Sequence, residues 1–197
     1  MNRFSTKLYE TKKINVPIIF DRDGIINYPR NLIKYPDDMF FIEDSLENIS
    51  LLSKNGAKIL FVFNEPNILK NLVSPDDVEK INQLILELLG KNGCTYIHGI
   101  YFSTTKFKED TMSLPNTGMF KKIEKELKIK LKGGFVVSDD IEHLKAALKF
   151  EMKPVLILSG NGNKTLDKLN TFANKKLKNV TKVFNNLKEF NNYVMNQ

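Results

Sequence analysis

A short apolar run that ends in acidic residues constrains this chain more than any other feature. Residues 16–20 read Val-Pro-Ile-Ile-Phe, and Asp21, Arg22, Asp23 and Gly24 follow directly. A continuous apolar run of this length, bounded by a turn signal, predicts a buried parallel strand. Acidic side chains at the carboxyl end of such a strand face the ligand crevice of an open α/β sheet.

The spacing of Asp21 and Asp23 predicts a cation site. The two carboxylates repel each other unless a cation lies between them. Oxygen ligands of this kind suit a hard cation, and Mg²⁺ is the best candidate. An aspartate at such a site can attack phosphorus and form an aspartyl-phosphate that water hydrolyses. The alternative interpretation of a bare Asp-x-Asp is a solvated turn or a helix cap.

Apolar runs alternate with helical patterns along the rest of the chain. Further strands are predicted at residues 57–63, 96–102, 135–138, 155–158 and 180–184, and helices at about 45–55, 74–92, 116–128, 141–150 and in two segments after residue 160. Residues 28–41 are predicted to form an irregular loop over the site. This alternation predicts an α/β fold: a Rossmann-like three-layer α/β/α sandwich with a mainly parallel sheet and a minimal cap domain or none.

Length and cysteine content exclude several classes of protein. A chain of 197 residues fits one domain, with a flexible arm at 1–15, a core at 16–160 and an extension at 161–197 that packs on the core. The apolar runs are too short to span a membrane, and the polar N-terminus is unlike a signal peptide. Cys94 is the single cysteine, which excludes an internal disulfide and fits a reducing cytoplasm.

The net charge of +7 raises the question of nucleic-acid binding. The excess lysines are scattered over predicted helix faces and the C-terminal segment, without interleaved aromatic residues or a recognisable binding motif. Ordinary solvation of these faces explains them, so we predict no nucleic-acid partner. A positive field would also attract a phosphorylated small molecule.

Residues 20–27 read Phe-Asp-Arg-Asp-Gly-Ile-Ile-Asn. This run resembles the first motif of the haloacid dehalogenase (HAD) superfamily of phosphohydrolases, in particular its histidinol-phosphate and heptose-bisphosphate phosphatase branch. The resemblance extends over residues 16–160. It implies a Mg²⁺-dependent phosphatase in which Asp21 is the nucleophile and Asp23 is the general acid and base.

The segment after the second predicted strand matches the branch in part. It reads Phe63-Asn64-Glu65-Pro66 where the branch usually has Thr-Asn-Gln-Ser, so Asn64 matches and Phe63 replaces a hydroxyl donor. Lys70 falls where the branch tends to place an arginine. The resemblance implies contacts to substrate or phosphate at Asn64, Arg22, Asn27 and Lys70.

The loop after the third predicted strand departs further from the branch. Residues 103–112 contain none of the cysteines and histidine that hold zinc in many relatives, so we predict no zinc. Leu114 stands where the branch has a lysine that neutralises phosphate. A nearby lysine could supply the missing charge, and the sequence does not decide among Lys106, Lys108, Lys121 and Lys122.

The fourth predicted strand ends in Ser138-Asp139-Asp140, which resembles the Val-Gly-Asp metal motif of the superfamily. The predicted Mg²⁺ ligands are therefore Asp21, Asp23, Asp139 and Asp140. The Asp139-Asp140 pair also precedes a helix and could cap it, and both roles are compatible. His143 stands where the family usually carries a further aspartate, and we interpret it as a structural residue.

Three functions are compatible with these features to different degrees. The first is a phosphatase of a small phosphorylated metabolite, most simply a sugar phosphate, that acts in the cytoplasm as a monomer or small homo-oligomer. The alternative is a catalytically degenerate relative that binds a ligand or a partner protein, since Phe63 and Leu114 are apolar where polar catalysts are expected. A receiver-like phosphoacceptor domain ranks last, because Asp-x-Asp on one strand followed by Asn64 fits it poorly.

Overall fold

A computed structural model describes residues 14–197, so nearly all of the predicted N-terminal arm lies outside the described residues. Six parallel strands form one sheet in the order β3-β2-β1-β4-β5-β6. Their bounds are β1 (Pro17–Phe20), β2 (Lys58–Asn64), β3 (Gly99–Ser103), β4 (Phe135–Ser138), β5 (Lys153–Ile157) and β6 (Lys182–Phe184). The predicted α/β fold with a parallel sheet is confirmed.

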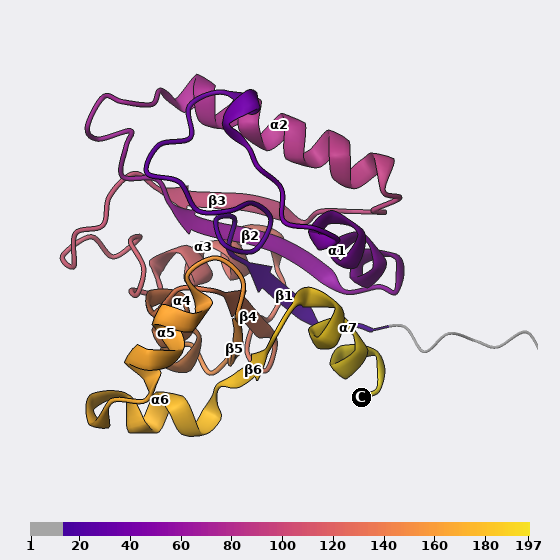
Figure 1. Ribbon diagram of the computed structural model, residues 1–197, viewed down its shortest axis with the longest axis vertical. Helices are drawn as coiled ribbons and strands as arrows, with labels where there is room; N and C mark the ends of the chain where they lie inside the picture. Colours follow the sequence, from indigo (N-terminus) through magenta and orange to yellow (C-terminus); the bar gives the residue numbers. More distant parts are fainter. Residues whose placement is uncertain (1–13) are drawn as a thin grey trace, which may run out of the picture.

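Helices cover both faces of the sheet (Figure 1). They are α1 (Ser45–Lys54), α2 (Pro75–Lys91), α3 (Gly118–Leu127), α4 (Ile141–Lys149), α5 (Gly162–Leu169), α6 (Lys175–Val180) and α7 (Leu187–Met195), with short 3-10 helices at Pro36–Asp38 and Phe172–Asn174. Side chains of α1, α2 and α7 pack on one face, and those of α3 and α4 pack on the other. Among residues 14–197, no helix combines the length and the hydropathy needed to cross a membrane.

The apolar run of β1 explains why this strand lies in the middle of the sheet. Ile18 and Phe20 are buried against the helices of one face, whereas Ile19 is buried against those of the other. A strand that is covered on both faces needs a continuous apolar sequence, which is what residues 16–20 provide. Each fully buried side chain of this size stabilises the fold by roughly 1.5–3 kcal/mol.

Local sequence signals set the ends of several elements. At the start of α2, Asp77 N–H donates to Ser74 Oγ (3.1 Å) and Ser74 N–H donates to Asp77 Oδ2 (2.9 Å), as expected for a capping box. The strand predicted at 96–102 begins later, at Gly99. A tertiary contact accounts for the difference: Ser53 Oγ on α1 donates to the carbonyl of Tyr96 (3.0 Å), so this carbonyl bonds α1 instead of a neighbouring strand.

The C-terminal residues complete the sheet and its core. β6 pairs in parallel with β5 at the sheet edge, and α7 returns across one face. The ring of Phe190 on α7 is fully buried and packs edge-on against Phe135, with ring centroids 5.5 Å apart. Residues 161–197 therefore contribute strand pairing and buried side chains to the same core as residues 16–160.

The strand order also fixes where a ligand can bind. β1 lies between β2, which follows it in the sequence, and β4, so the strand order reverses at β1. In open α/β sheets, ligands bind outside the carboxyl ends of the strands at such a switch point. The segments that follow β1 and β4 are those that carry Asp21 and Asp139.

Candidate active site

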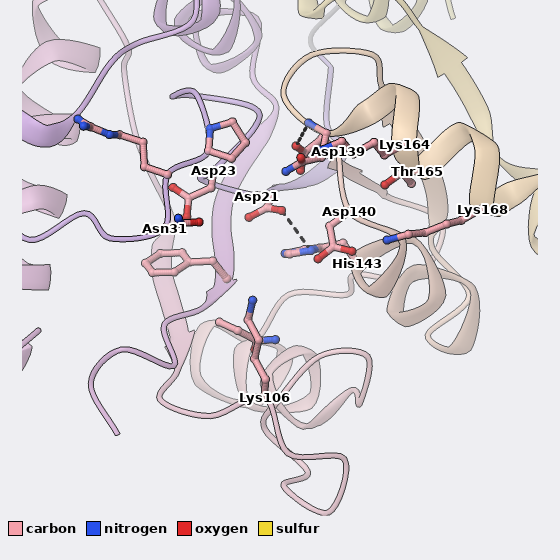
Figure 2. Close-up of a pocket in the computed structure, with 15 residues that line it drawn as sticks. Asp21, Asp23, Asn31, Lys106, Asp139, Asp140, His143, Lys164, Thr165 and Lys168 are labelled. Atoms are coloured by element: carbon pink, nitrogen blue, oxygen red, sulfur yellow. Dashed lines mark hydrogen bonds and ion pairs between the residues drawn. The ribbon is translucent and has the colours of Figure 1, made fainter. Parts of the chain in front are cut away.

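A cavity of about 420 Å³ opens at the carboxyl edge of the sheet. Figure 2 shows acidic residues from the ends of β1 and β4 meeting across it. The residues predicted from sequence that line it are Asp21, Asp23, Asn64, Asp139 and Asp140. The cavity is also lined by residues that the sequence did not assign to the site, chiefly His143 and lysines from two separate segments.

Asp21, directly after β1, is held by two hydrogen bonds to its carboxylate. Its Oδ1 accepts the backbone N–H of Arg22 (2.8 Å), and its Oδ2 accepts Ser138 Oγ (2.8 Å) from the end of β4. Burial, together with the negative charge of Asp23, raises the pKa of Asp21 well above its ordinary value, although the hydrogen bond from Ser138 opposes this. A carboxylate in this position needs compensating positive charge to stay ionised.

Asp139 lies in a close-fitting backbone cradle. A Cβ at Gly24 or at Gly160 would overlap its carboxylate, so glycine is needed at both positions. The backbone N–H of Asn161 donates to Asp139 Oδ2 (2.6 Å). Burial and the nearby charge of Asp21 raise the pKa of Asp139. Two neighbouring buried carboxylates with raised pKa values form a site suited to a bound cation.

Asp140 has a different environment from its neighbour. Its Oδ1 accepts the backbone N–H of Glu142 (3.1 Å) and caps α4, while its own N–H donates to Ser138 Oγ (2.9 Å). Of the Asp139-Asp140 pair, Asp140 therefore fills the capping role, and Asp139 lies in the glycine cradle. Asp140 also lines the cavity, and its predicted role in metal binding stays a prediction.

Asp23 is oriented by its neighbours in sequence. Arg22 Nε and Nη2 donate to its two carboxylate oxygens (3.0 and 3.1 Å), and Asn27 Nδ2 donates to Oδ1 (2.9 Å). Burial favours the neutral form of Asp23, but the charge of Arg22 and these hydrogen bonds prevail and lower its pKa. Arg22 and Asn27 are buried and position Asp23, and their predicted contacts with substrate stay predictions.

Arg22 connects Asp23 to the second strand through a buried ion pair. Its Nη2 lies 2.9 Å from Glu65 Oε2, and both side chains are almost fully buried. The guanidinium also lies 4.4 Å from the ring centre of Phe63, which stacks on Phe102. Phe63, apolar where a hydroxyl donor was expected, therefore covers this buried charge.

Asn64 and Leu114 are joined across the site. Leu114 N–H donates to Asn64 Oδ1 (3.2 Å), and Asn64 Nδ2 donates to the Leu114 carbonyl (3.4 Å). The side chain of Leu114 points into the hydrophobic core rather than the cavity and is almost fully buried. Position 114 thus anchors its loop to β2 and leaves the cavity without a cation from this residue.

His143 lies in the site, although its position in the sequence suggested a structural residue. Its Nε2 donates to the carbonyl of Val62 (2.9 Å), which fixes the ring, and its Nδ1 lies 3.2 Å from Asp21 Oδ2. Burial lowers the pKa of His143. The predicted structural role of His143 thus applies to Nε2, which bonds the Val62 carbonyl. Its Nδ1 faces Asp21 in the site.

A second cavity of about 280 Å³ adjoins the first and extends toward Lys70. The two cavities share Asp23, Asn64 and Lys106 in their walls. A small molecule whose reacting group lies at Asp21 has room for its remaining atoms in this second space. Lys70 is thus placed along the predicted substrate path, and its contact with substrate stays a prediction.

An acidic pair after the central strand, a further aspartate after the adjacent strand and a switch-point cavity define an aspartate-based phosphohydrolase. The heptose-1,7-bisphosphate 7-phosphatase of Pseudomonas putida is 30% identical over 152 residues, which cover 77% of this chain and 87% of the relative. The Neisseria meningitidis serogroup A enzyme of the same name is 27% identical over 182 residues, which cover 91% of this chain and 95% of the relative. No family model matches the chain.

Solved structures agree with the fold. The heptose 1,7-bisphosphate phosphatase of B. bronchiseptica, determined with magnesium and phosphate, superposes with a TM-score of 0.82 at 23% identity and covers 92% of this chain and 98% of its own. The Burkholderia thailandensis phosphatase superposes with a TM-score of 0.69 at 22% identity, covering 92% and 99%. The chain belongs to the HAD superfamily, in the branch of the heptose-bisphosphate phosphatases.

Proposed function

We propose that this protein is a Mg²⁺-dependent phosphatase that hydrolyses a small phosphorylated sugar through an aspartyl-phosphate at Asp21. The observation that carries the proposal is the placement of Asp21 at the switch point, held by Ser138 and the Arg22 N–H and facing a cavity that Asp139 shares. The curated relatives are heptose-1,7-bisphosphate 7-phosphatases, which makes a sugar bisphosphate the first substrate to test.

The carboxylates fit a magnesium ion. Among residues 14–197, no three His, Cys, Asp or Glu side chains form a ready-made metal cluster, and Mg²⁺ usually takes only one or two protein carboxylates, with water and substrate phosphate completing its shell. Asp21 and Asp139 would hold it, since burial and then nearby negative charge raise both pKa values, and a cation would stabilise the ionised forms. When bound, Mg²⁺ supplies positive charge against the phosphoryl oxygens.

The residues of the site then support a reaction in two steps. Asp21 attacks phosphorus, the bond between phosphorus and the sugar oxygen breaks, and Asp23 gives a proton to that oxygen. Asp23 then takes a proton from water, whose oxygen attacks phosphorus and breaks the bond to Asp21. The negative phosphoryl group beside Asp23 opposes the effect of Arg22 on its pKa, which lets this carboxyl hold the proton for the first half.

The degenerate binding module is not favoured. Phe63 and Leu114, which suggested it, have structural roles: one covers the buried Arg22 and the other fills the core. The acidic residues that a phosphatase needs are placed around one cavity. Location in the cytoplasm, the lack of a nucleic-acid partner and a monomeric or small homo-oligomeric state stay predictions.

We expect phosphate release that requires Mg²⁺. The purified protein is incubated with heptose 1,7-bisphosphate, hexose bisphosphates and histidinol phosphate, and inorganic phosphate is measured with Mg²⁺, with EDTA and after Mg²⁺ is restored. Release should fall to background in EDTA, because the Asp21 and Asp139 charges are then uncompensated, and should return with Mg²⁺. Equal release with and without EDTA, or no release from any ester, would contradict the proposal.

A further inference from the structure

We propose that Lys106 contacts the transferred phosphoryl group as a catalytic cation, and that Asp110 positions it. The inference rests on the proposed function. It begins from charge: four carboxylates line the cavity, and a phosphoryl group brings further negative charge. Positive groups aimed at the phosphoryl oxygens, in addition to a metal ion, are therefore needed to let an anionic nucleophile approach.

Four cationic side chains line the cavity, and they differ in what they face. Arg30 is engaged by its own loop, since Nη1 donates to the Asp38 carbonyl (3.2 Å) and the guanidinium lies over Phe40. Lys164 and Lys168 extend from α5 on the side of Asp139 and Asp140 (Figure 2). The fourth cation, Lys106, lies across the cavity from α5 (Figure 2).

Lys106 extends from the loop after β3 toward Asp21 (Figure 2). It lines the central cavity, the cavity toward Lys70 and the adjoining space beside Leu114, so it stands where the three meet. It is also close enough to Asp23 for its charge to add, after the larger effect of Arg22, to the lowering of that pKa. Among these cations, Lys106 is best placed to face a phosphoryl group between Asp21 and Asp23.

The residue directly before Lys106 is held on three sides. Thr105 N–H donates to Ser103 Oγ (3.2 Å), and the Thr105 carbonyl accepts Ser113 Oγ (3.0 Å). The hydroxyl of Thr105 donates to Asp110 Oδ2 (2.6 Å). Ser103 and Ser113 are buried, so these hydrogen bonds fix the base of the lysine to the end of β3 and to the far side of the loop.

Asp110 is the centre of this network. Its carboxylate accepts the hydroxyls of Thr105 and Ser103 (3.2 Å for the latter) and the backbone N–H of Met112 (2.9 Å). These hydrogen bonds, that of Thr105 first, hold the pKa of Asp110 below its ordinary value, so it is ionised at neutral pH. Asn116 Nδ2 in turn donates to the Asp110 carbonyl (2.9 Å). Asp110 thereby organises the loop from Ser103 to Asn116 through its carboxylate and its backbone carbonyl.

The test compares Lys106→Met with Lys108→Met, which removes the same charge from an exposed position of the same loop outside the central cavity. We expect Lys106→Met to lower kcat by about 10²-fold and Lys108→Met to stay within about twofold of wild type. Lys106→Arg should recover part of the loss. Unchanged kcat in Lys106→Met would overturn the role of Lys106.

A second readout does not depend on turnover. Binding of inorganic phosphate in the presence of Mg²⁺ is measured by calorimetry, and Lys106→Met should weaken it by about tenfold because one charge-assisted hydrogen bond is lost. If wild type hydrolyses no ester, the proposed function fails while this measurement still tests Lys106. Equal phosphate affinity in Lys106→Met and Lys108→Met would overturn the inference.

The positioning role of Asp110 requires a double-mutant cycle. Asp110→Asn should lower kcat by about tenfold in the wild-type background, because Lys106 loses its fixed base, with little change in KM. In the Lys106→Met background, the same substitution should have almost no further effect on kcat. Equal losses in both backgrounds would mean that Asp110 only stabilises the loop, and would overturn its positioning role.

Discussion

Asp21→Asn is expected to reduce phosphate release by about 10⁴-fold or more, because the amide cannot act as the nucleophile. The substitution keeps the size of the side chain. Its amide oxygen can accept the Arg22 N–H, and its NH2 group can donate to Ser138 Oγ in place of the hydrogen bond that Asp21 Oδ2 accepts. The substitution also replaces a carboxyl whose ionisation is unfavourable in this buried position, so the melting temperature without metal should not fall.

The measurement is single-turnover and steady-state phosphate release from the best ester of the panel. Asp167→Asn is a matched control, since it removes an aspartate charge from an exposed position of α5. The control should retain the activity of wild type. Asp21→Asn with more than about one hundredth of wild-type activity would be incompatible with Asp21 as nucleophile.

Glu65→Leu is expected to lower the free energy of unfolding by about 3 kcal/mol, the lower end of the range for breaking a buried ion pair. The substitution leaves the almost fully buried Arg22 with Asp23 as its remaining carboxylate partner. Burial lowers the pKa of Arg22, but the charge of Asp23, with that of Glu65, raises it above the ordinary value, so the guanidinium stays charged. The folded state is then destabilised, because its buried guanidinium charge has one carboxylate partner fewer.

Urea unfolding followed by circular dichroism measures this change as a shift in the midpoint. Glu87→Leu is the control, because its pair with Lys91 is shorter (2.6 Å) than the buried pair but exposed, and no measurable change is expected. Glu65→Gln, which keeps an acceptor for Arg22, should lie between Glu65→Leu and wild type. An unfolding midpoint for Glu65→Leu that equals that of Glu87→Leu would show that the buried pair does not stabilise the fold.

Much of the fold could be predicted from the sequence, because its strands are buried on both faces and read as continuous apolar runs. The same property brought Asp21, Asn64 and Asp139 together, since Asn64 ends a strand, Asp21 and Asp139 directly follow one, and parallel strands end at one edge. These predictions use local sequence and one topological rule. They need no knowledge of side-chain contacts.

The parts that could not be predicted depend on contacts between distant segments. His143 meets Val62, 81 residues away, and Asn64 meets Leu114, 50 residues away. The buried pair of Arg22 and Glu65 spans 43 residues. No local sequence pattern identifies partners so far apart. From the sequence, Leu114 could be interpreted only as the loss of the lysine found in relatives, and the nearby lysine that faces the site could not be identified.

The central claim is that Asp21 carries the phosphoryl group during turnover. The most direct measurement quenches the reaction with substrate and Mg²⁺ in denaturant and reduces the protein with borohydride, which converts an acyl phosphate of aspartate to homoserine. Trypsin then releases residues 14–22 as one peptide for sequencing by mass spectrometry. Homoserine is expected at position 21 in wild type when substrate is present. Aspartate at position 21 while phosphate release proceeds would contradict it.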